Sequence, residues 1–171
     1  VEQADIVIFA VQPRHFKEIL EEVKTVIQNK LVVSLVTGFK LQAIEAILGE
    51  STKIVRAMPN TAIAVKQSTT CLCSNVQGTQ HIDKIEYLFN KLGTTIRISE
   101  EQMQAATVVC ASGIAFWMRL IRATTQAAIQ LGFESEKAQE MSVNTCLGAA
   151  SLLLESGHHP EQEIDRVTTP R

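Results

Sequence analysis

The stretch Asp5-Ile6-Val7-Ile8-Phe9-Ala10-Val11-Gln12-Pro13 indicates how this chain folds, because an unbroken apolar run gives way to a helical pattern led by proline. Such a run is typical of a strand buried on both faces of a parallel sheet. Pro13 suits the first position of a helix, where a missing N–H costs nothing. Apolar residues then recur at helical spacing to Ile27, and residues 31–36 return to a β-branched run. We therefore predict a βαβ unit.

The same alternation continues along the chain to about Ile98. Residues 41–48 read as a helix that Gly49 ends, and residues 53–58 read as a strand that Pro59 breaks. A strand at 68–74, a helix at 82–92 and a strand at 94–98 follow. The pattern predicts an α/β fold with an incomplete doubly wound, Rossmann-like parallel sheet.

Past Ser99 the strand pattern stops and helices take over. Ser99 is a suitable N-cap for a helix that opens with Glu100. Glycines at 132 and 157 end two long helical stretches, the second of which starts at Ser135, and Pro160 opens a last short helix. We predict two domains, an α/β domain over residues 1–98 and an all-helical domain over residues 99–171.

The helical half carries an excess of apolar surface. Residues 105–121 approach the length of a membrane span, but the run contains Thr107, Ser112 and Gly113 and has two arginines near its end. We interpret it as a buried helix of a soluble protein. One helical layer beside a sheet cannot cover this much apolar surface, so we expect part of it to be buried against a second subunit.

Composition limits the class of partner. The 171 residues are 46% hydrophobic, which supports a buried core. With 16 Lys and Arg against 18 Asp and Glu, the net charge of −2 gives no basic surface for nucleic acid or for an anionic membrane. We expect a small-molecule ligand, no nucleic acid and no membrane.

Cysteine and histidine usage predicts no metal site. The four cysteines have no framework spacing and no secretory signal before them, which indicates a reduced, cytoplasmic setting. Cys71 and Cys73 would share one face of a strand, where packing is favoured over metal binding. His158 and His159 follow a helix end, where a solvated position is favoured over a metal ligand.

Three strand ends carry the functional prediction, because the chain has no G-x-S-x-G, H-E-x-x-H, P-loop or G-x-G-x-x-G motif and we assign no catalytic residue. They are Ala10-Val11-Gln12-Pro13, Val36-Thr37-Gly38 and Met58-Pro59-Asn60-Thr61. In a parallel sheet they would open at the same edge, where α/β folds bind ligands. Backbone N–H groups in such turns suit an anion or a ribose. For each alone, an ordinary turn is the alternative.

Thr169 and Pro170 add a fourth element near the end of the sequence. An N-cap residue followed by a proline predicts the start of a helix. The free N–H groups of that helix would favour a carboxylate. The alternative is a plain surface turn.

Four motifs together resemble the pyrroline-5-carboxylate reductase family. In chain order they are Asp5–Pro13, Val55–Thr61 (VRAMPNT), Ala111–Phe116 (ASGIAF) and Val167–Pro170 (VTTP). The resemblance covers essentially the whole chain, and the second and fourth motifs are its most specific parts. It implies reduction of Δ1-pyrroline-5-carboxylate to L-proline with NADPH or NADH, the last step of proline biosynthesis.

The resemblance also implies roles for individual residues. The cofactor would contact Ala10, Val11, Gln12, Pro13, Thr37, Met58, Pro59 and Asn60, and the substrate carboxylate would lie at Thr168, Thr169 and Pro170. Residues 1–98 would form a dinucleotide-binding domain without its first βα unit. Residues 99–171 would form the dimerisation and substrate domain of a homodimer with interleaved C-terminal helices, and a higher oligomer stays open.

Some residues depart from the family pattern. Gln12 stands where a lysine is usual, which removes a charge near the cofactor. Ala111, Ile114 and Phe116 replace a glycine, a proline and a tyrosine, so we expect a less sharply bent backbone there, and Arg171 replaces a glycine. Because the glycine-rich opening unit is absent and the sequence opens at a valine, we expect the chain to be a piece of a longer protein.

Two other function classes remain open. One is another imine or 2-hydroxyacid oxidoreductase of the same plan, but such enzymes generally carry a lysine base on the first long helix of the second domain, and residues 103–122 contain no lysine. The other is a non-catalytic dimerisation or ligand-sensing module. Binding of NADPH and of proline would separate that module from the reductase.

Overall fold

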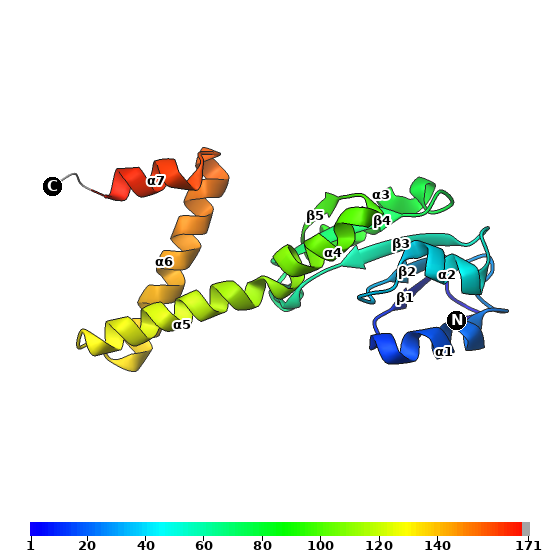
Figure 1. The fold of residues 1–171 in the computed structure, drawn as a ribbon, viewed down its shortest axis with the longest axis horizontal. Helices are drawn as coiled ribbons and strands as arrows, with labels where there is room; N and C mark the ends of the chain where they lie inside the picture. Colours follow the sequence, from blue (N-terminus) through cyan, green and yellow to red (C-terminus); the bar gives the residue numbers. More distant parts are fainter. Residues whose placement is uncertain (169–171) are drawn as a thin grey trace. The chain divides into compact units, whose positions relative to one another are not determined.

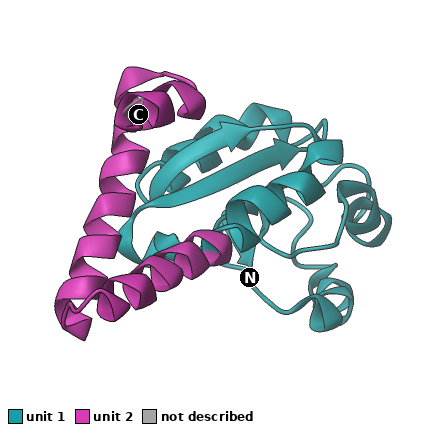
Figure 2. Ribbon diagram, turned by 60° about the vertical axis from the view of Figure 1, so that its left-hand side comes forward, with its two compact units in different colours: residues 1–114 teal, residues 115–171 magenta. Residues whose placement is uncertain are grey.

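The computed structural model describes residues 1–168 and divides into two compact units, which are coloured in Figure 2. The first unit is Val1–Ile114 and the second begins at Ala115. Figure 1 traces the order of the elements along the chain. Strands and helices alternate in the first unit, and the described part of the second unit is helical.

A five-stranded sheet forms the centre of the first unit, and its strands lie in the order in which the chain makes them. The strands are β1 (Ile6–Phe9), β2 (Leu31–Ser34), β3 (Lys53–Met58), β4 (Ser68–Ser74) and β5 (Gly93–Arg97). The first three are mutually parallel, β4 is antiparallel to β3, and β5 is parallel to β4. The α/β, Rossmann-like class is confirmed, but the sheet is mixed.

The reversal at β4 corrects the prediction of a wholly parallel sheet, and the length of the connection explains it. A parallel crossover needs about a dozen residues or more. Only residues 59–67 join β3 to β4, and part of them forms the short 3-10 helix η1 (Thr61–Val65). This connection can return the chain beside β3 only in the opposite direction.

Helices cover both faces of the sheet. The α-helices of the first unit are α1 (Pro13–Val23), α2 (Leu41–Leu48), α3 (Ile82–Phe89) and α4 (Met103–Ala106), with shorter turns η2 (Thr79–His81) and η3 (Glu100–Gln102). One apolar cluster joins α1 and α2 to one sheet face, and its members include Phe16, Ile44 and Met103. A second cluster packs Ile85 and Phe89 of α3 against the other face.

The start of β5 shows why α3 ends three positions earlier than the pattern predicts. Gly93 has φ +141° and pairs with Ser68 of β4. A Cβ at Gly93 would lie 2.0 Å from the Ser68 carbonyl oxygen, so the chain passes closer to β4 than any side chain allows. The strand therefore begins at this glycine, and residues 90–92 form the turn before it.

The first unit extends further than the predicted boundary at residues 98 and 99. Met103 is 1% exposed and belongs to the core, and Ala106, Cys110 and Ala111 pack against that core. The change from strand to helix does occur at Ser99, as expected. Helical residues before Ile114 nevertheless pack against the core of the first unit. The sequence pattern changes at Ser99, whereas the boundary between the two compact units follows Ile114.

Helix α4 runs into a π-helical segment, Thr107–Ser112, which we call the π segment. The Thr107 hydroxyl donates to the Met103 carbonyl oxygen at 2.8 Å. A Cβ at Gly113 would lie 1.9 Å from the Val109 carbonyl oxygen. With alanine at 111 and isoleucine at 114, where the family has a glycine and a proline, the backbone is still irregular here.

The second unit consists of α5 (Ile114–Gln130, apart from its first residue), α6 (Ser135–Ser156) and α7 (Pro160–Val167). The starts at Ser135 and Pro160 are as predicted, whereas the stretch predicted to open at Glu100 is divided into several helical segments before α5. Gly132 and Gly157 adopt φ of +100° and +65°, which is why helices end there. Between residues 115 and 168 only Ala138, Ser142 and Glu163 are buried. Large apolar side chains such as Trp117 and Leu120 are exposed in the single chain.

By length and composition, one helical stretch, Glu100–Gln130, is apolar enough to cross a bilayer. Of the most apolar 18 consecutive residues in this stretch, only 6% are buried within the chain. The predicted burial of this stretch is therefore not provided by the rest of the described chain, apart from the residues of its first part that pack on the sheet.

Candidate functional site

The three predicted strand ends do lie at one edge of the sheet. Because β1, β2 and β3 are parallel, their carboxyl ends point the same way. Two of the three ends meet at a cavity of about 540 Å³, which we call the strand-end pocket. Its lining residues come from three segments: Leu35, Thr37, Met58, Pro59, Asn60, Thr61, Ile63, Thr107, Ala111 and Ser112.

The third end, Ala10–Pro13, is outside that lining. Pro13 opens α1 as predicted, and the N-cap residue Gln12 makes no side-chain capping bond. The Gln12 carbonyl accepts from the His15 N–H at 3.0 Å. Ala10, Gln12 and Pro13 are exposed. A ligand that contacted all three strand ends would therefore extend beyond the strand-end pocket along the sheet edge.

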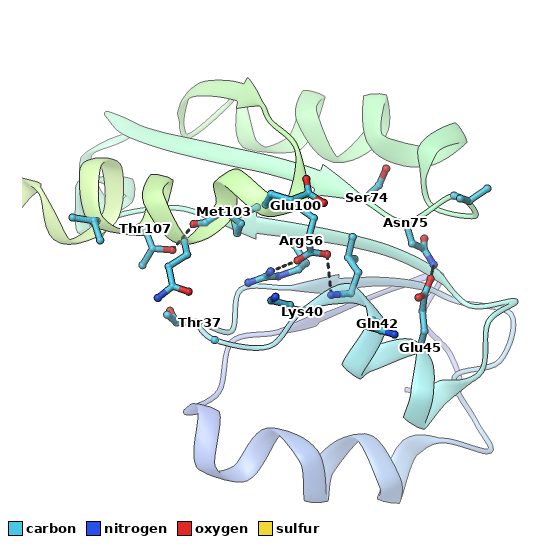
Figure 3. A pocket seen from close by; sticks show the side chains of 16 residues that line it. Thr37, Lys40, Gln42, Glu45, Arg56, Ser74, Asn75, Glu100, Met103 and Thr107 are labelled. Atoms are coloured by element: carbon cyan, nitrogen blue, oxygen red, sulfur yellow. Dashed lines mark hydrogen bonds and ion pairs between the residues drawn. The ribbon is translucent and has the colours of Figure 1, made fainter.

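Thr37 sits between the strand-end pocket and a second hollow. Its hydroxyl lies 3.9 Å from the Met58 sulfur, which brings two predicted cofactor residues together. Thr37 also lines a cavity of about 740 Å³ beside α2, β3 and the helical residues 100–108 (Figure 3). Several polar groups of this second hollow bond to one another, as Glu45 does with Asn75 at 2.9 Å.

A buried ion pair holds the loop that carries Thr37. Arg56 of β3 is 5% exposed, and its guanidinium pairs with the Glu100 carboxylate (Figure 3). The other Glu100 oxygen accepts from the Leu41 N–H at 2.9 Å, so the same carboxylate satisfies the first turn of α2. Among the described residues, the Arg56 Nε has no hydrogen-bond partner.

Sequence reasoning missed this ion pair, although a signal was present. An arginine inside the apolar run 53–58 must find a counter-charge when the strand is buried. The pattern gives no means of choosing Glu100 among the eighteen acidic residues, because the pairing depends on how helix and sheet meet.

Asn60 is the most fully bonded of the predicted site residues. Its backbone N–H donates to the Ser68 hydroxyl oxygen at 3.0 Å, and its side-chain oxygen accepts from the Ala62 N–H at 2.9 Å. Its side-chain amide donates to the Cys110 carbonyl oxygen at 2.9 Å. This last bond joins the loop after β3 to the π segment.

The cysteines near the pocket are packed, as predicted. Cys71 and Cys73 are buried in the core on one face of β4. Burial raises the pKa of Cys71 to about 11 and that of Cys73 to about 12, so both remain thiols at neutral pH. The Cys71 and Cys110 sulfurs are 3.8 Å apart. Within residues 1–168 no group of three possible metal ligands comes together.

The C-terminal site residues are only partly described. Thr168 follows α7, is exposed, and donates its hydroxyl to the Ile164 carbonyl oxygen at 3.1 Å. Thr169 and Pro170, the residues of the predicted carboxylate site, lie outside the described residues. Of the two adjacent histidines, His159 caps α7, and His158 Nδ1 lies 2.5 Å from the Glu163 carboxylate.

Comparison with known proteins gives matches along the whole chain. A family model described as pyrroline-5-carboxylate reductase dimerisation matches residues 100–171. A second model, described as NADP oxidoreductase, coenzyme F420-dependent, matches residues 1–38. The chain is 41% identical to pyrroline-5-carboxylate reductase 1 of Dictyostelium discoideum, a match that covers all of this chain and 33% of the relative.

Solved structures share the fold. The Plasmodium falciparum pyrroline carboxylate reductase with NADP bound superposes with a TM-score of 0.93 at 26% identity, over 99% of this chain and 65% of that one. The enzyme from Coxiella burnetii superposes with a TM-score of 0.89 at 34% identity, over 99% and 64%. The chain thus spans from a third to about two thirds of the length of these relatives. By sequence along its length and by fold, it belongs to the pyrroline-5-carboxylate reductase family.

Proposed function

We propose that the whole protein catalyses the NAD(P)H-dependent reduction of Δ1-pyrroline-5-carboxylate to L-proline. The observation that carries the proposal is the strand-end pocket, which joins Thr37, the Met58–Asn60 turn and the π segment at the carboxyl edge of parallel strands. Ligands bind at this edge in open α/β folds. The relatives with this sequence pattern are reductases by name.

The lining of the strand-end pocket fits a nicotinamide ring. Leu35, Met58, Pro59 and Ile63 supply apolar surface, and the hydroxyls and amide of the other lining residues supply polar contacts around it. When bound, the cofactor would supply the hydride. On this proposal Thr37, Met58, Pro59 and Asn60 border the ring. The backbone of Ala10, Val11, Gln12 and Pro13 extends the cofactor site along the edge.

The chain's own contribution to the reaction is orientation. No carboxylate, imidazole, amine or thiol side chain lines the strand-end pocket among the described residues. Such a lining suits a reaction whose rate depends on holding two reactants in contact, because positioning alone can lower a barrier by several kcal/mol, roughly 7–11 in favourable cases. We place the substrate carboxylate at Thr168, Thr169 and Pro170.

We also propose that α5, α6 and α7 form a homodimer interface in a cytoplasmic protein, with no membrane partner. The many exposed apolar side chains of α5 support this, since monomeric proteins rarely expose large contiguous apolar patches. The match of residues 100–171 to a dimerisation family supports a second copy of the chain as the partner. Arg119 and Arg122 within α5 disfavour lipid as the partner.

The test is turnover by the whole protein. We expect loss of NADPH absorbance when pyrroline-5-carboxylate is added, with proline as the product. Folded, dimeric protein that gives no turnover above the uncatalysed rate would contradict the proposal. Reduction of 2-oxo acids in place of the imine would assign it to the hydroxyacid class instead.

A further inference from the structure

We infer that Asn60 is a positioning residue of the strand-end pocket: its side-chain amide fixes the π segment against the end of β3. The inference rests on the proposed function, because the positioned wall is the one that would enclose the reacting groups. It assigns to Asn60 a role that acts through another segment, in addition to any contact with a bound ring.

The bonding of Asn60 leaves its side chain little freedom. Its backbone N–H is fixed to Ser68, and its side-chain oxygen caps η1 through the Ala62 N–H. With the oxygen committed at 2.9 Å, the amide nitrogen must point the other way, toward the Cys110 carbonyl, also at 2.9 Å. Both ends of one planar group therefore connect two segments that are far apart in the sequence.

The π segment is the kind of backbone that needs such an anchor. Its wider turn departs from the regular i→i+4 ladder of the helix, and a carbonyl oxygen there has a lone pair that can accept a bond from outside the helix. The Cys110 carbonyl accepts such a bond from Asn60. The next two residues, Ala111 and Ser112, line the strand-end pocket.

The consequence for catalysis is geometric. Pro59 and Asn60 line the pocket from the strand side, and Ala111 and Ser112 line it from the helical side. The amide-to-carbonyl bond sets the spacing of these two walls. Hydride transfer requires the reacting atoms at about 3–3.5 Å, and a displacement of about 1 Å can cost on the order of a hundredfold in rate.

The variant Asn60→Asp tests the inference in the whole protein. Aspartate keeps the oxygen that caps η1, but at neutral pH it presents a carboxylate oxygen to the Cys110 carbonyl. We expect kcat to fall about ten- to a hundredfold at about pH 8, with a smaller change in the Kd for NADPH. A change in NADPH affinity with unchanged kcat would instead make Asn60 a simple cofactor ligand.

The pH dependence separates positioning from general damage. A protonated carboxyl group can donate to the Cys110 carbonyl as the amide does. The facing carbonyl disfavours the charged form and the Ala62 N–H favours it, so the introduced aspartate should titrate near its ordinary pKa of about 3.9, and its protonated fraction grows toward pH 5. We expect the ratio of variant to wild-type kcat to rise as the pH falls from about 8 to about 5. A flat ratio would overturn the inference.

Asn90→Asp is the matched control. Asn90 is exposed, and its side-chain oxygen accepts from the Thr95 N–H at 3.2 Å and from the Thr95 hydroxyl at 2.8 Å, bonds that aspartate retains. We expect wild-type kcat at every pH. If Asn60→Asp does not fold, Asn60→Ser keeps a capping oxygen without reaching Cys110, and the same fall in kcat is expected.

Hydrogen exchange tests the anchor without relying on turnover. In Asn60→Asp at neutral pH, backbone amides of the π segment should exchange severalfold faster than in the wild type, while those of β2 should not change. If amide exchange in the π segment of Asn60→Asp equals that of the wild type, the inference is overturned, whatever the effect of the substitution on turnover. A wild type that lacks turnover, with faster exchange in the variant, would leave the anchor standing and defeat only the proposed reaction.

Discussion

The carboxylate of Glu100 joins three elements of the first unit. It bonds to Arg56 on β3 and to the first N–H of α2, so three elements meet at one side chain. Glu100 is placed by the Ser99 turn, in which the Gln102 side chain accepts from the Ser99 N–H at 3.1 Å. A polar group of this kind is expensive to leave unpaired once buried.

We predict that Glu100→Gln lowers the free energy of unfolding by about 1–3 kcal/mol, because a neutral amide still accepts from Leu41 but no longer balances the buried Arg56. Denaturant unfolding of the whole protein measures the change. The control is Asp83→Asn, which removes an exposed partner of Arg97 and should cost less than about 1 kcal/mol. Equal losses in the two variants would show that burial of the Arg56 pair is unimportant.

Cys73 supplies a second prediction for a single side chain. Burial raises its pKa to about 12, and the thiolate is the reactive form. In the native protein, Cys73 should therefore escape alkylation at about pH 8, and it should react once denaturant unfolds the chain. Peptide mapping after labelling identifies the site. Rapid native labelling of Cys73 would mean that β4 opens locally.

Much of the residue-level detail could be predicted from the sequence where the chemistry is local. Pro13 at a helix start and Gly157 at a helix end follow from the sequence because a cap depends on the few residues beside it. The bonds from Arg56 to Glu100 and from Asn60 to Cys110 could not be predicted, since each crosses between segments that are distant in the chain. The edge of the sheet that holds the strand-end pocket is predictable from the sequence. The contribution of the π segment to the lining of that pocket is not.

Among the elements, the π segment is the one that departs most from a regular pattern. It lies in the middle of the apolar run that reads as one uninterrupted helix, yet it widens before Gly113. A buried glycine at that point leaves room for the Val109 carbonyl. Periodicity could not reveal the wider turn, because one inserted residue hardly changes the apolar spacing over a long run.

Gly113→Ala should therefore destabilise the first unit by about 1–3 kcal/mol, since the added methyl group forces the backbone at Val109 to move. Thermal or denaturant unfolding measures the change. Ser112→Ala, at the neighbouring exposed position, should change the free energy of unfolding by no more than about 0.5 kcal/mol. Retention of full stability by Gly113→Ala would mean that the π segment relaxes without cost.

The attachment of α3 to β5 gives a pH-dependent prediction. A hydrogen bond from the Arg97 guanidinium holds the pKa of Glu86 below its ordinary value. The folded state thus favours the charged carboxylate, and its contribution to stability is present above the unfolded pKa of about 4.3 and lost as the pH falls through the folded value. Glu86→Gln should flatten that part of the stability profile measured by unfolding at several pH values. If the free energy of unfolding of Glu86→Gln falls in acid as steeply as that of the wild type, the prediction is wrong.

For the whole molecule, the main question is what covers the second unit. Three helices with three buried residues between positions 115 and 168 do not make a core of their own. Along α5 the polar residues Arg119, Arg122, Gln126 and Gln130 recur at helical spacing and leave a surface that is apolar apart from two threonines. A second copy of the chain is the partner that we propose.

We predict that Leu120→Lys converts the dimer to a monomer or lowers its affinity by at least about a hundredfold, because a buried, unpaired ammonium group is costly. Leu120 is 58% exposed in the single chain. Light scattering or sedimentation measures the mass. Gln126→Lys, in the polar stripe of the same helix, should leave the dimer intact. A dimer that tolerates the charge at position 120 would place the interface elsewhere.

The order of the strands in the sheet has a consequence for how the protein forms during synthesis. Within residues 1–168 the five strands pair only with their neighbours in chain order, so none of these pairings waits for a distant segment. Loop closure is cheap for such neighbours, and folding is fast when contacts are local. The sheet can therefore grow strand by strand as the chain leaves the ribosome. Glu100, which follows β5, then ties these strands together by reaching back to Arg56.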